Sequence, residues 1–328
     1  MGNLITEYNT NTSGSLPEFD EEYQYNVVET NIDDELYNVK IYSEYPLTFI
    51  SFEGNNNLIE LNYIETKDLT STYNLFYNCK NLTYVDLRGC DFSNVETIER
   101  MFTYCSNLEK IDGLNDIDIS NVNNMGGLFS DCSKIQELDV KDWDVSKVTN
   151  FGAVFRRCPM LTKIDVSKWD TSNGIIMSGI FTNCSGLIEL DVSSWIVGKA
   201  DTISQMFYGC SKLTKLTLFK YIGPNVVTTY LFGKCDKLKN VISINSDYNT
   251  INILAKELPT KKASDYGIFD IEGVDNISLV DIELIKSKFW NGYDWAISKP
   301  RAKTYNNNCG IKHKGSNIAI ISFCKRKI

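Results

Sequence analysis

The sequence predicts a right-handed α/β solenoid, a rod of stacked coils with a parallel β-sheet along one face. A Phe-x-x-Cys motif returns seven times at intervals of 25 to 27 residues, and apolar residues follow each Cys at fixed offsets. The chain has 328 residues, of which 43% are hydrophobic, so a long continuous core is possible. A coil of this length cannot bury its apolar face alone, whereas stacked coils bury it against their neighbours.

The motif residues predict two columns that run through this core. The Phe column is Phe76, Phe102, Phe129, Phe155, Phe181, Phe207 and Phe232. The Cys column is Cys79, Cys105, Cys132, Cys158, Cys184, Cys210 and Cys235. A degenerate copy with Phe52 and Asn55 in the motif positions precedes them. We therefore expect the solenoid to cover residues 49–243, with an atypical first coil, as terminal repeats usually are.

The apolar residues after each Cys predict one strand per coil. They stand at Cys+3 and Cys+6, and usually at Cys+8. This spacing is the L-x-x-L-x-L pattern of a leucine-rich-repeat strand. The unit LDVKDWDVSKVTNFGAVFRRC, from Leu138 to Cys158, resembles the BspA-type leucine-rich repeats of bacterial surface proteins. The resemblance covers about residues 52–243. It implies a leucine-rich-repeat solenoid and a role in adhesion and surface binding.

The segment before the array, residues 1–48, predicts a polar arm and a β-type cap or docking element. The first twenty residues are polar and are expected to form a flexible arm. Strand-like runs follow around Tyr23–Val28, Leu36–Tyr42 and Leu47–Phe52.

Two segments follow the array. Residues 244–298 predict a C-terminal cap with a helix that starts at the capping-box-like pair Ser278 and Asp281 and stops at Asn291-Gly292. Residues 299–328 form a basic tail with one strand-like run, Ile318–Phe323. This run either adds a strand to a partner's sheet edge or is an edge strand of the protein's own cap.

The ten cysteines do not predict a metal site. The sequence has no C-x-x-C and a single His, so the ligand spacing of a zinc site is missing. Seven of the cysteines, an odd number, share the same spacing from a Phe, which favours reduced thiols packed in the core as small hydrophobic side chains. Cys90, Cys309 and Cys324 lie outside this column and have no assigned role.

Two columns of charged residues are the candidate binding surface. Carboxylates at Cys+7 must point outward, because they lie between inward apolar positions: Asp86, Asp112, Asp139, Asp165 and Asp191. Two positions earlier, the charge alternates in sign along the stack: Lys110, Glu137, Lys163, Glu189 and Lys215. One interpretation is a solvated face on which the lysines offset repulsion among the carboxylates. The other is a polar docking surface or a weak cation site.

An aromatic row accompanies these columns at Cys+11. Trp143, Trp169 and Trp195 occupy it, with Tyr221 next in line. Such a row suggests a carbohydrate platform. It falls where the coil must turn after its strand, which favours packing against the neighbouring coil instead.

Motifs and charge argue against catalysis and nucleic-acid binding. The single His, His313, lies in the tail without a triad motif, and no phosphate-binding glycine loop is present. The net charge is −9, and the tail from Lys299 has eight Lys/Arg and no acid, which leaves −17 for residues 1–298. The solenoid thus lacks the basic face that phosphates require. We predict that the protein is not an enzyme, needs no cofactor or metal, and binds no nucleic acid through the solenoid.

The N-terminus has no secretory signal and no segment is long enough to span a membrane, so we expect neither signal-dependent export nor membrane insertion. Combined with the surface-binding resemblance, this favours a phage virion-associated component of a tail or fibre, assembled in the host cytoplasm, that acts in host attachment or assembly. The alternatives are an intracellular protein–protein scaffold and a cell-surface adhesin without its signal peptide. The expected ligand is a protein or glycan surface, and the acidic N-terminal arm and basic tail are expected to contact partner subunits.

Overall fold

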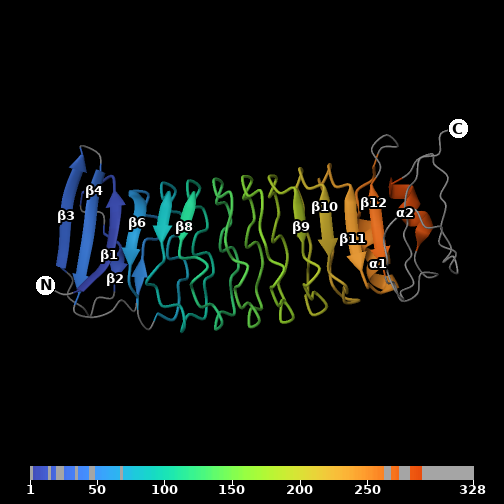
Figure 1. The fold of residues 1–328 in the computed structure, drawn as a ribbon, viewed down its shortest axis with the longest axis horizontal. Helices are drawn as coiled ribbons and strands as arrows, with labels where there is room; N and C mark the ends of the chain where they lie inside the picture. Colours follow the sequence, from blue (N-terminus) through green and yellow to red (C-terminus); the bar gives the residue numbers. More distant parts are fainter. Residues whose placement is uncertain are drawn as a thin grey trace, which may run out of the picture.

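The computed structural model describes residues 3–13, 16–19, 26–33, 36–43, 49–66, 69–261, 267–272 and 281–289. The chain forms an elongated parallel β-solenoid of about eight turns, in which the coils follow one another along the rod (Figure 1). The described residues include few helices, so the fold is mostly β instead of the expected α/β. The repeat solenoid itself agrees with the leucine-rich-repeat pattern of the sequence.

Two sheets lie along the strand face of the rod. The first has the order β3-β4-β1-β6-β7-β8, with β1 (Asn3–Thr10), β3 (Asn26–Asp33), β4 (Leu36–Ser43), β6 (Leu58–Ile64), β7 (Tyr84–Asp86) and β8 (Lys110–Asp112). The second has the order β12-β11-β10-β9, with β9 (Glu189–Asp191), β10 (Lys215–Leu218), β11 (Asn240–Ile244) and β12 (Ile268–Glu272). A short pair joins β2 (Glu18–Phe19) to β5 (Ile50–Ser51).

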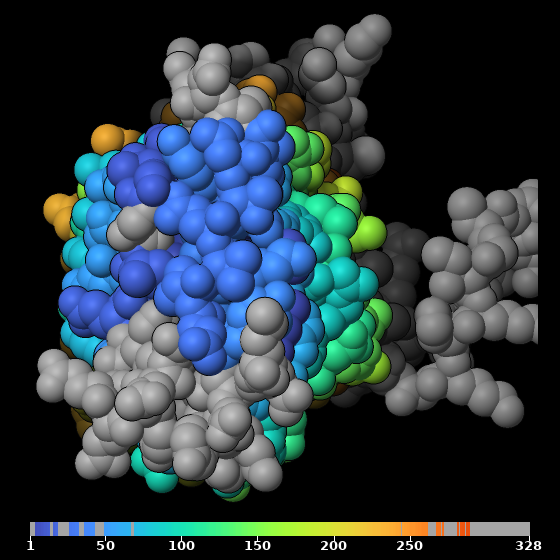
Figure 2. Space-filling model, turned by 90° about the vertical axis from the view of Figure 1, so that its left-hand side faces the viewer, coloured from blue at the N-terminus to red at the C-terminus, as the bar shows by residue number. Residues whose placement is uncertain are grey.

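Successive coils pair in parallel, whereas the N-terminal strands pair antiparallel. Strand β1 lies between β4 and β6 and is antiparallel to both. The sequence pattern placed β1 in a polar arm, but Ile5, Thr6, Tyr8 and Thr10 are buried in this strand. The polar sequence gives no clear strand signal, because this strand depends on backbone pairing with a neighbouring strand on each side, β4 and β6. We call β1, β3 and β4 the N-terminal extension, and its strands (blue) face the viewer in Figure 2.

The core contains a continuous stack of phenylalanine rings, one from each coil. Phe52 and the seven motif residues lie with neighbouring ring centroids 5.3 to 6.1 Å apart and interplanar angles of 4 to 17°. Tyr8 of β1 meets Phe52 edge-on at 5.3 Å and ends the stack on the N-terminal side. Aromatic pairs in this range contribute about 0.5–1.5 kcal/mol beyond burial of their area. The ring column therefore strengthens the contact between each coil and the next.

The cysteine column follows the phenylalanine column and is bound to it. Each motif thiol donates a hydrogen bond to the carbonyl oxygen of the Phe one coil earlier, over 2.8 to 3.1 Å. All seven thiols are fully buried and none is in a disulfide. Burial raises the pKa of Cys79, Cys158 and Cys235 to about 12, which keeps these thiols protonated.

The backbone around each Phe forms hydrogen bonds that all point the same way along the rod. Phe102 N donates to Leu128 O at 2.9 Å, and Phe155 N donates to Ile180 O at 2.9 Å, so each donor bonds to the following coil. Residues two before and two after each motif Phe have positive φ; Ala153 has a φ of 58°. This conformation costs a non-Gly residue about 1–2 kcal/mol. It persists because it turns alternate N–H groups toward the next coil.

Two helices lie at the C-terminal end of the rod (Figure 1). Helix α1 (Tyr248–Glu257) buries Ile251, Leu254 and Ala255 against the last coil. Its Glu257 carboxylate accepts hydrogen bonds from Thr228 Oγ1 at 3.2 Å and Leu231 N at 3.3 Å. This places a negative charge where the aligned N–H groups of the solenoid end, a favourable arrangement for peptide dipoles.

Helix α2 (Ile282–Phe289) corresponds to the helix expected after Ser278. Asp281 Oδ1 accepts a hydrogen bond from Leu284 N at 2.9 Å, so Asp281 is its N-cap. Ser278, Asn291-Gly292 and the tail at 299–328 lie outside the described residues. That the helices close the end of the core stays a prediction.

Phe155→Ala removes a ring that stacks on Phe129 at 5.9 Å and on Phe181 at 5.4 Å. We expect the free energy of unfolding to fall by about 3–5 kcal/mol, because the substitution leaves a cavity in the core. Each coil contacts only its neighbours, so the two halves of the array should also unfold in separate transitions. Denaturant unfolding followed by circular dichroism measures both effects. Tyr73→Ala, at a side chain that is 48% exposed, is the control. A Phe155→Ala curve that coincides with that of the wild type would contradict the stacked core.

The buried thiol column predicts a protected pattern of alkylation. At pH 8 a small alkylating reagent should leave the seven motif cysteines unmodified in the folded protein and modify all of them after denaturation. Peptide mass spectrometry gives the extent of reaction at each site. Cys90 is only partly buried, but burial raises the pKa of its thiol to about 12 as well, so the denatured protein provides the comparison. Motif cysteines that react as fast in the native protein as in the denatured protein would disprove their burial.

Candidate functional site

The strand face is interrupted where one coil is a residue longer than its neighbours. The step from Phe102 to Phe129 is 27 residues, whereas the steps on either side are 26. The extra residue is at Gly113, which has a φ of 75° and lies where other coils carry an inward apolar side chain. A Cβ at Gly113 would lie 2.8 Å from the backbone of Arg88, so only glycine fits this bulge. Leu114, one residue later, takes the inward place.

Hydrogen bonding across the strand face is sparse beyond this bulge. Residues 133–140 and 159–166 belong to no strand, although they carry the repeat pattern. Among the residues that the structure describes, one backbone hydrogen bond joins these segments to a neighbouring coil, from Thr162 N to Gln136 O at 3.1 Å. The sheet therefore ends at β8 and resumes at β9. Backbone groups of two coils are left without partners from the sheet.

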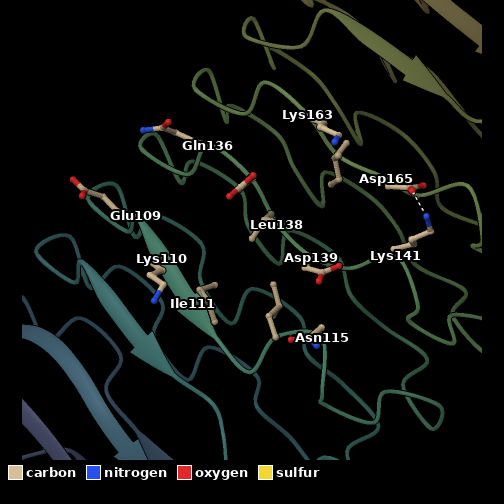
Figure 3. Close-up of a pocket in the computed structure, with 13 residues that line it drawn as sticks. Glu109, Lys110, Ile111, Asn115, Gln136, Leu138, Asp139, Lys141, Lys163 and Asp165 are labelled. Atoms are coloured by element: carbon tan, nitrogen blue, oxygen red, sulfur yellow. Dashed lines mark ion pairs between the residues drawn. The ribbon is translucent and has the colours of Figure 1, made fainter.

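A groove of about 680 Å³ opens at this interruption (Figure 3). We call it the strand-face groove. Its lining residues are Glu109, Lys110, Ile111, Leu114, Asn115, Gln136, Glu137, Leu138, Asp139, Lys141, Lys163, Ile164 and Asp165. Ile111, Leu114, Leu138 and Ile164 supply its apolar surface. Leu138 and Ile164 are 8 and 9% exposed, whereas Leu216 at the equivalent position of β10 is fully buried.

Several charged side chains around the groove are already paired. Lys141 Nζ lies 2.7 Å from an Asp165 carboxylate oxygen, the contact drawn as a dashed line in Figure 3. Hydrogen bonding from Lys141, and then from Ser167, holds the pKa of Asp165 well below its usual range. Lys110 pairs with Asp112 of its own strand at 2.8 Å. These pairs fix the edges of the groove and leave their members less available to a ligand.

Three charged side chains of the groove have no such partner. Glu137, Asp139 and Lys163 are exposed, and they form no hydrogen bond or ion pair with any residue that the structure describes. Both signs of charge are thus available beside an apolar surface. Polar groups that lack partners are the ones a ligand can bind without first breaking an existing contact.

The five carboxylates predicted at Cys+7 do not act as one column. Four of them form hydrogen bonds or ion pairs within the chain, whereas Asp139 forms neither with a described residue. The partners, in order along the rod, are Arg88 for Asp86, Tyr84 and Lys110 for Asp112, Lys141 and Ser167 for Asp165, and Ser193 for Asp191. No cluster of three or more potential metal ligands occurs among the described residues. Most of these aspartates stabilise turns at the strand ends.

In the column of alternating charges at Cys+5, the described residues include one ion pair between neighbouring coils. Lys215 and Glu189 face each other in the register of β9 and β10, and their charged atoms lie 3.6 Å apart. Lys110, Glu137 and Lys163 form no ion pairs with one another across the described coils, because the sheet is interrupted between them. The sequence carried a signal of this interruption: the longer repeat and the missing apolar residue at Cys+8.

The tryptophan row is buried and does not form a platform. Trp143, Trp169 and Trp195 are at most 5% exposed, and their rings stack with centroids 6.3 and 6.1 Å apart. Each indole N–H donates to a carbonyl of the preceding coil, as Trp143 Nε1 does to Leu114 O at 2.9 Å. Tyr221, next in the row, differs and is 47% exposed.

None of the described helices is long and apolar enough to cross a membrane. No curated protein matches this sequence. The family described as "Mycoplasma protein of unknown function, DUF285" matches residues 70–164 and 127–245, which together span more than half of the chain and most of the solenoid. This match is compatible with the resemblance to BspA-type repeats without being specific to it. Together with the repeat solenoid, it indicates a repeat protein of the binding or surface type. The chain belongs to the DUF285 family.

Proposed function

We propose that the protein is a non-enzymatic binding protein and that the strand-face groove holds its ligand. The observation that carries this proposal is the interruption of a regular sheet by a single extra residue. It opens an apolar surface beside the free charges of Glu137, Asp139 and Lys163. Where the sheet is regular, the equivalent charges of Glu189 and Lys215 are paired with each other.

The chemistry of the groove favours a protein ligand, in the form of an extended peptide segment. The lining residues include no aromatic ring on which a sugar could stack. Apolar side chains lie below charges of both signs, which suits a segment with an apolar anchor and flanking charged residues. Those backbone groups of residues 133–140 and 159–166 that have no partner in the sheet add donors and acceptors of the kind that extended peptides use. A glycan is the second candidate.

Selection from a peptide library on the full-length protein tests this proposal. The double variant Asp139→Lys with Lys163→Glu reverses two free charges without changing the net charge. We expect it to weaken binding of the enriched peptides at least tenfold, because a hydrogen bond to a charged group contributes about 1.5–3 kcal/mol and tenfold corresponds to about 1.4 kcal/mol. Fluorescence anisotropy with labelled peptides gives the Kd of each variant.

The matched control is Asp236→Lys with Lys237→Glu, which exchanges two exposed charges outside the groove. It should bind the peptides as the wild type does. Equal binding by the groove variant would place the peptide elsewhere and overturn the proposal. Enrichment of no peptide, with glycan-array binding that the groove variant loses, would favour the glycan instead.

For the setting, we propose a phage virion-associated role in host attachment or assembly, with the groove for recognition and the termini for contacts with partner subunits. The charge separation between residues 1–298 and the tail supports an oriented subunit in a larger assembly. Quantitative mass spectrometry should find the protein enriched in purified particles relative to the host cell fractions. Enrichment in the cytosol would favour an intracellular scaffold, and enrichment at the cell surface would favour an adhesin.

A further inference from the structure

Strand β3 is an open edge at the N-terminal end of the rod (Figure 1). It is the terminal strand of the six-stranded sheet and pairs with β4 on one side. No described strand lies on its other side. Edge strands present a row of backbone donors and acceptors, and proteins usually protect them with Lys, Pro, bulges or short length. Strand β3 spans eight residues and contains neither Lys nor Pro, and its pairing with β4 is regular from Asn26 to Asn31, with one irregularity at the end, between Asn31 and Asp33.

Both faces of β3 are uncovered. Every residue from Asn26 to Ile32 is exposed. Val27, Val28 and Ile32 are 41, 43 and 53% exposed. Adjacent residues of a strand point to opposite faces, so Val27 and Val28 present apolar surface on the two sides of the sheet. A strand added beside β3 would pair its backbone and find apolar neighbours on both faces.

Acidic residues flank β3 at both ends of its sequence. Asp20, Glu21 and Glu22 precede it, and Asp33, Asp34 and Glu35 end or follow it. Strand β4 contributes the first basic residue of the chain, Lys40. In the sequence, β3 thus has acidic residues on both flanks, which suits a segment that is apolar in its centre and basic on either side.

The C-terminal tail has that composition. Its apolar run Ile318–Phe323 has Lys312 and Lys314 before it and Lys325, Arg326 and Lys327 after it. Because both segments carry their charges on both flanks, the charges match whether the added strand runs parallel or antiparallel to β3. We propose that the tail of a second copy of this chain adds as a strand to the open edge of β3, joining the copies head to tail.

The position of the two ends favours a second copy over the same chain. Strand β3 lies at one end of the rod, and β12 and α2 lie at the other (Figure 1). About eleven strand spacings of roughly 4.8 Å separate β3 from β12, or about 50 Å. A tail that reached β3 of its own copy would have to stay extended along the rod, at a cost in conformational entropy. A second copy that approaches end-on needs no such extension.

Disulfide trapping in the full-length chain tests this contact, because Cys324 directly follows the apolar run. Two variants, Val27→Cys and Ile32→Cys, each place a thiol near one end of β3. A disulfide requires Cα atoms about 4.4–6.8 Å apart. Under mild oxidation we expect one of the two variants to form covalent dimers and longer chains, and its position reveals the direction of the added strand. Peptide mass spectrometry should identify Cys324 in the link, and adding Cys324→Ser should abolish it.

Sedimentation velocity supplies a second measurement that needs no new cysteine. The wild type should associate with increasing concentration and dissociate with salt, because the flanking charges are exposed. Ile320→Pro should abolish association without lowering the melting temperature of the solenoid, because proline cannot donate to a sheet ladder. Lys163→Glu in the groove should leave association unchanged, which separates this contact from ligand binding.

Three results would overturn the inference. One is a wild type that stays monomeric at its highest soluble concentration. Another is a link from residue 27 or 32 to Cys324 that is found only within monomers, which would mean that the tail folds back on its own copy. The third is covalent dimers joined through residue 27 or 32 of both copies, which would mean that two β3 edges meet.

Discussion

The structure depends on one repeated contact, the stacking of a phenylalanine ring on the ring of the next coil. Rings from Phe52 to Phe232 lie 5.3 to 6.1 Å apart without a gap. The thiols that bond to the Phe carbonyls and the N–H groups that all point to the following coil repeat at the same interval. Left-handed residues such as Ala153 are strained alone and are held because each coil is fixed between two others.

The groove is possible because the two sides of a coil are independent. On the Phe side, the rings of Phe102 and Phe129 remain 5.5 Å apart across the longer coil. On the strand side, the same coil ends the sheet at β8, and Leu138 and Ile164 line the groove while they remain 8 and 9% exposed. The Phe side keeps its ring stacking and stabilises the rod, whereas the strand side lacks the backbone hydrogen bonds of a continuous sheet. A groove can therefore form in the middle of the array without uncoupling its halves.

The two ends of the rod are built differently. At the C-terminal end, helix α1 buries Ile251 and Leu254 on the last coil and places Glu257 near the last N–H groups. At the N-terminal end, Tyr8 ends the ring stack, but the sheet continues outward through β1 and β4 to the uncovered β3. A solenoid that ends in an open strand is unusual, because such an edge invites pairing with another chain.

The sequence by itself determined the period of the coils and the two core columns, because both depend on a local spacing that recurs in every repeat. The outward position predicted for the Asp residues does not hold for Asp86, which is 7% exposed. The sequence also held the signal of the groove, in the extra residue before Leu114, although spacing alone does not say whether a longer coil bulges outward or opens the sheet. Only the tertiary structure decided which charges are paired, since Asp165 forms an ion pair with Lys141 of the preceding coil while Asp139 forms no hydrogen bond or ion pair with a described residue. It likewise decided that Asn3–Thr10 is a strand, because a polar segment gains order only from the partners that the fold places on either side of it.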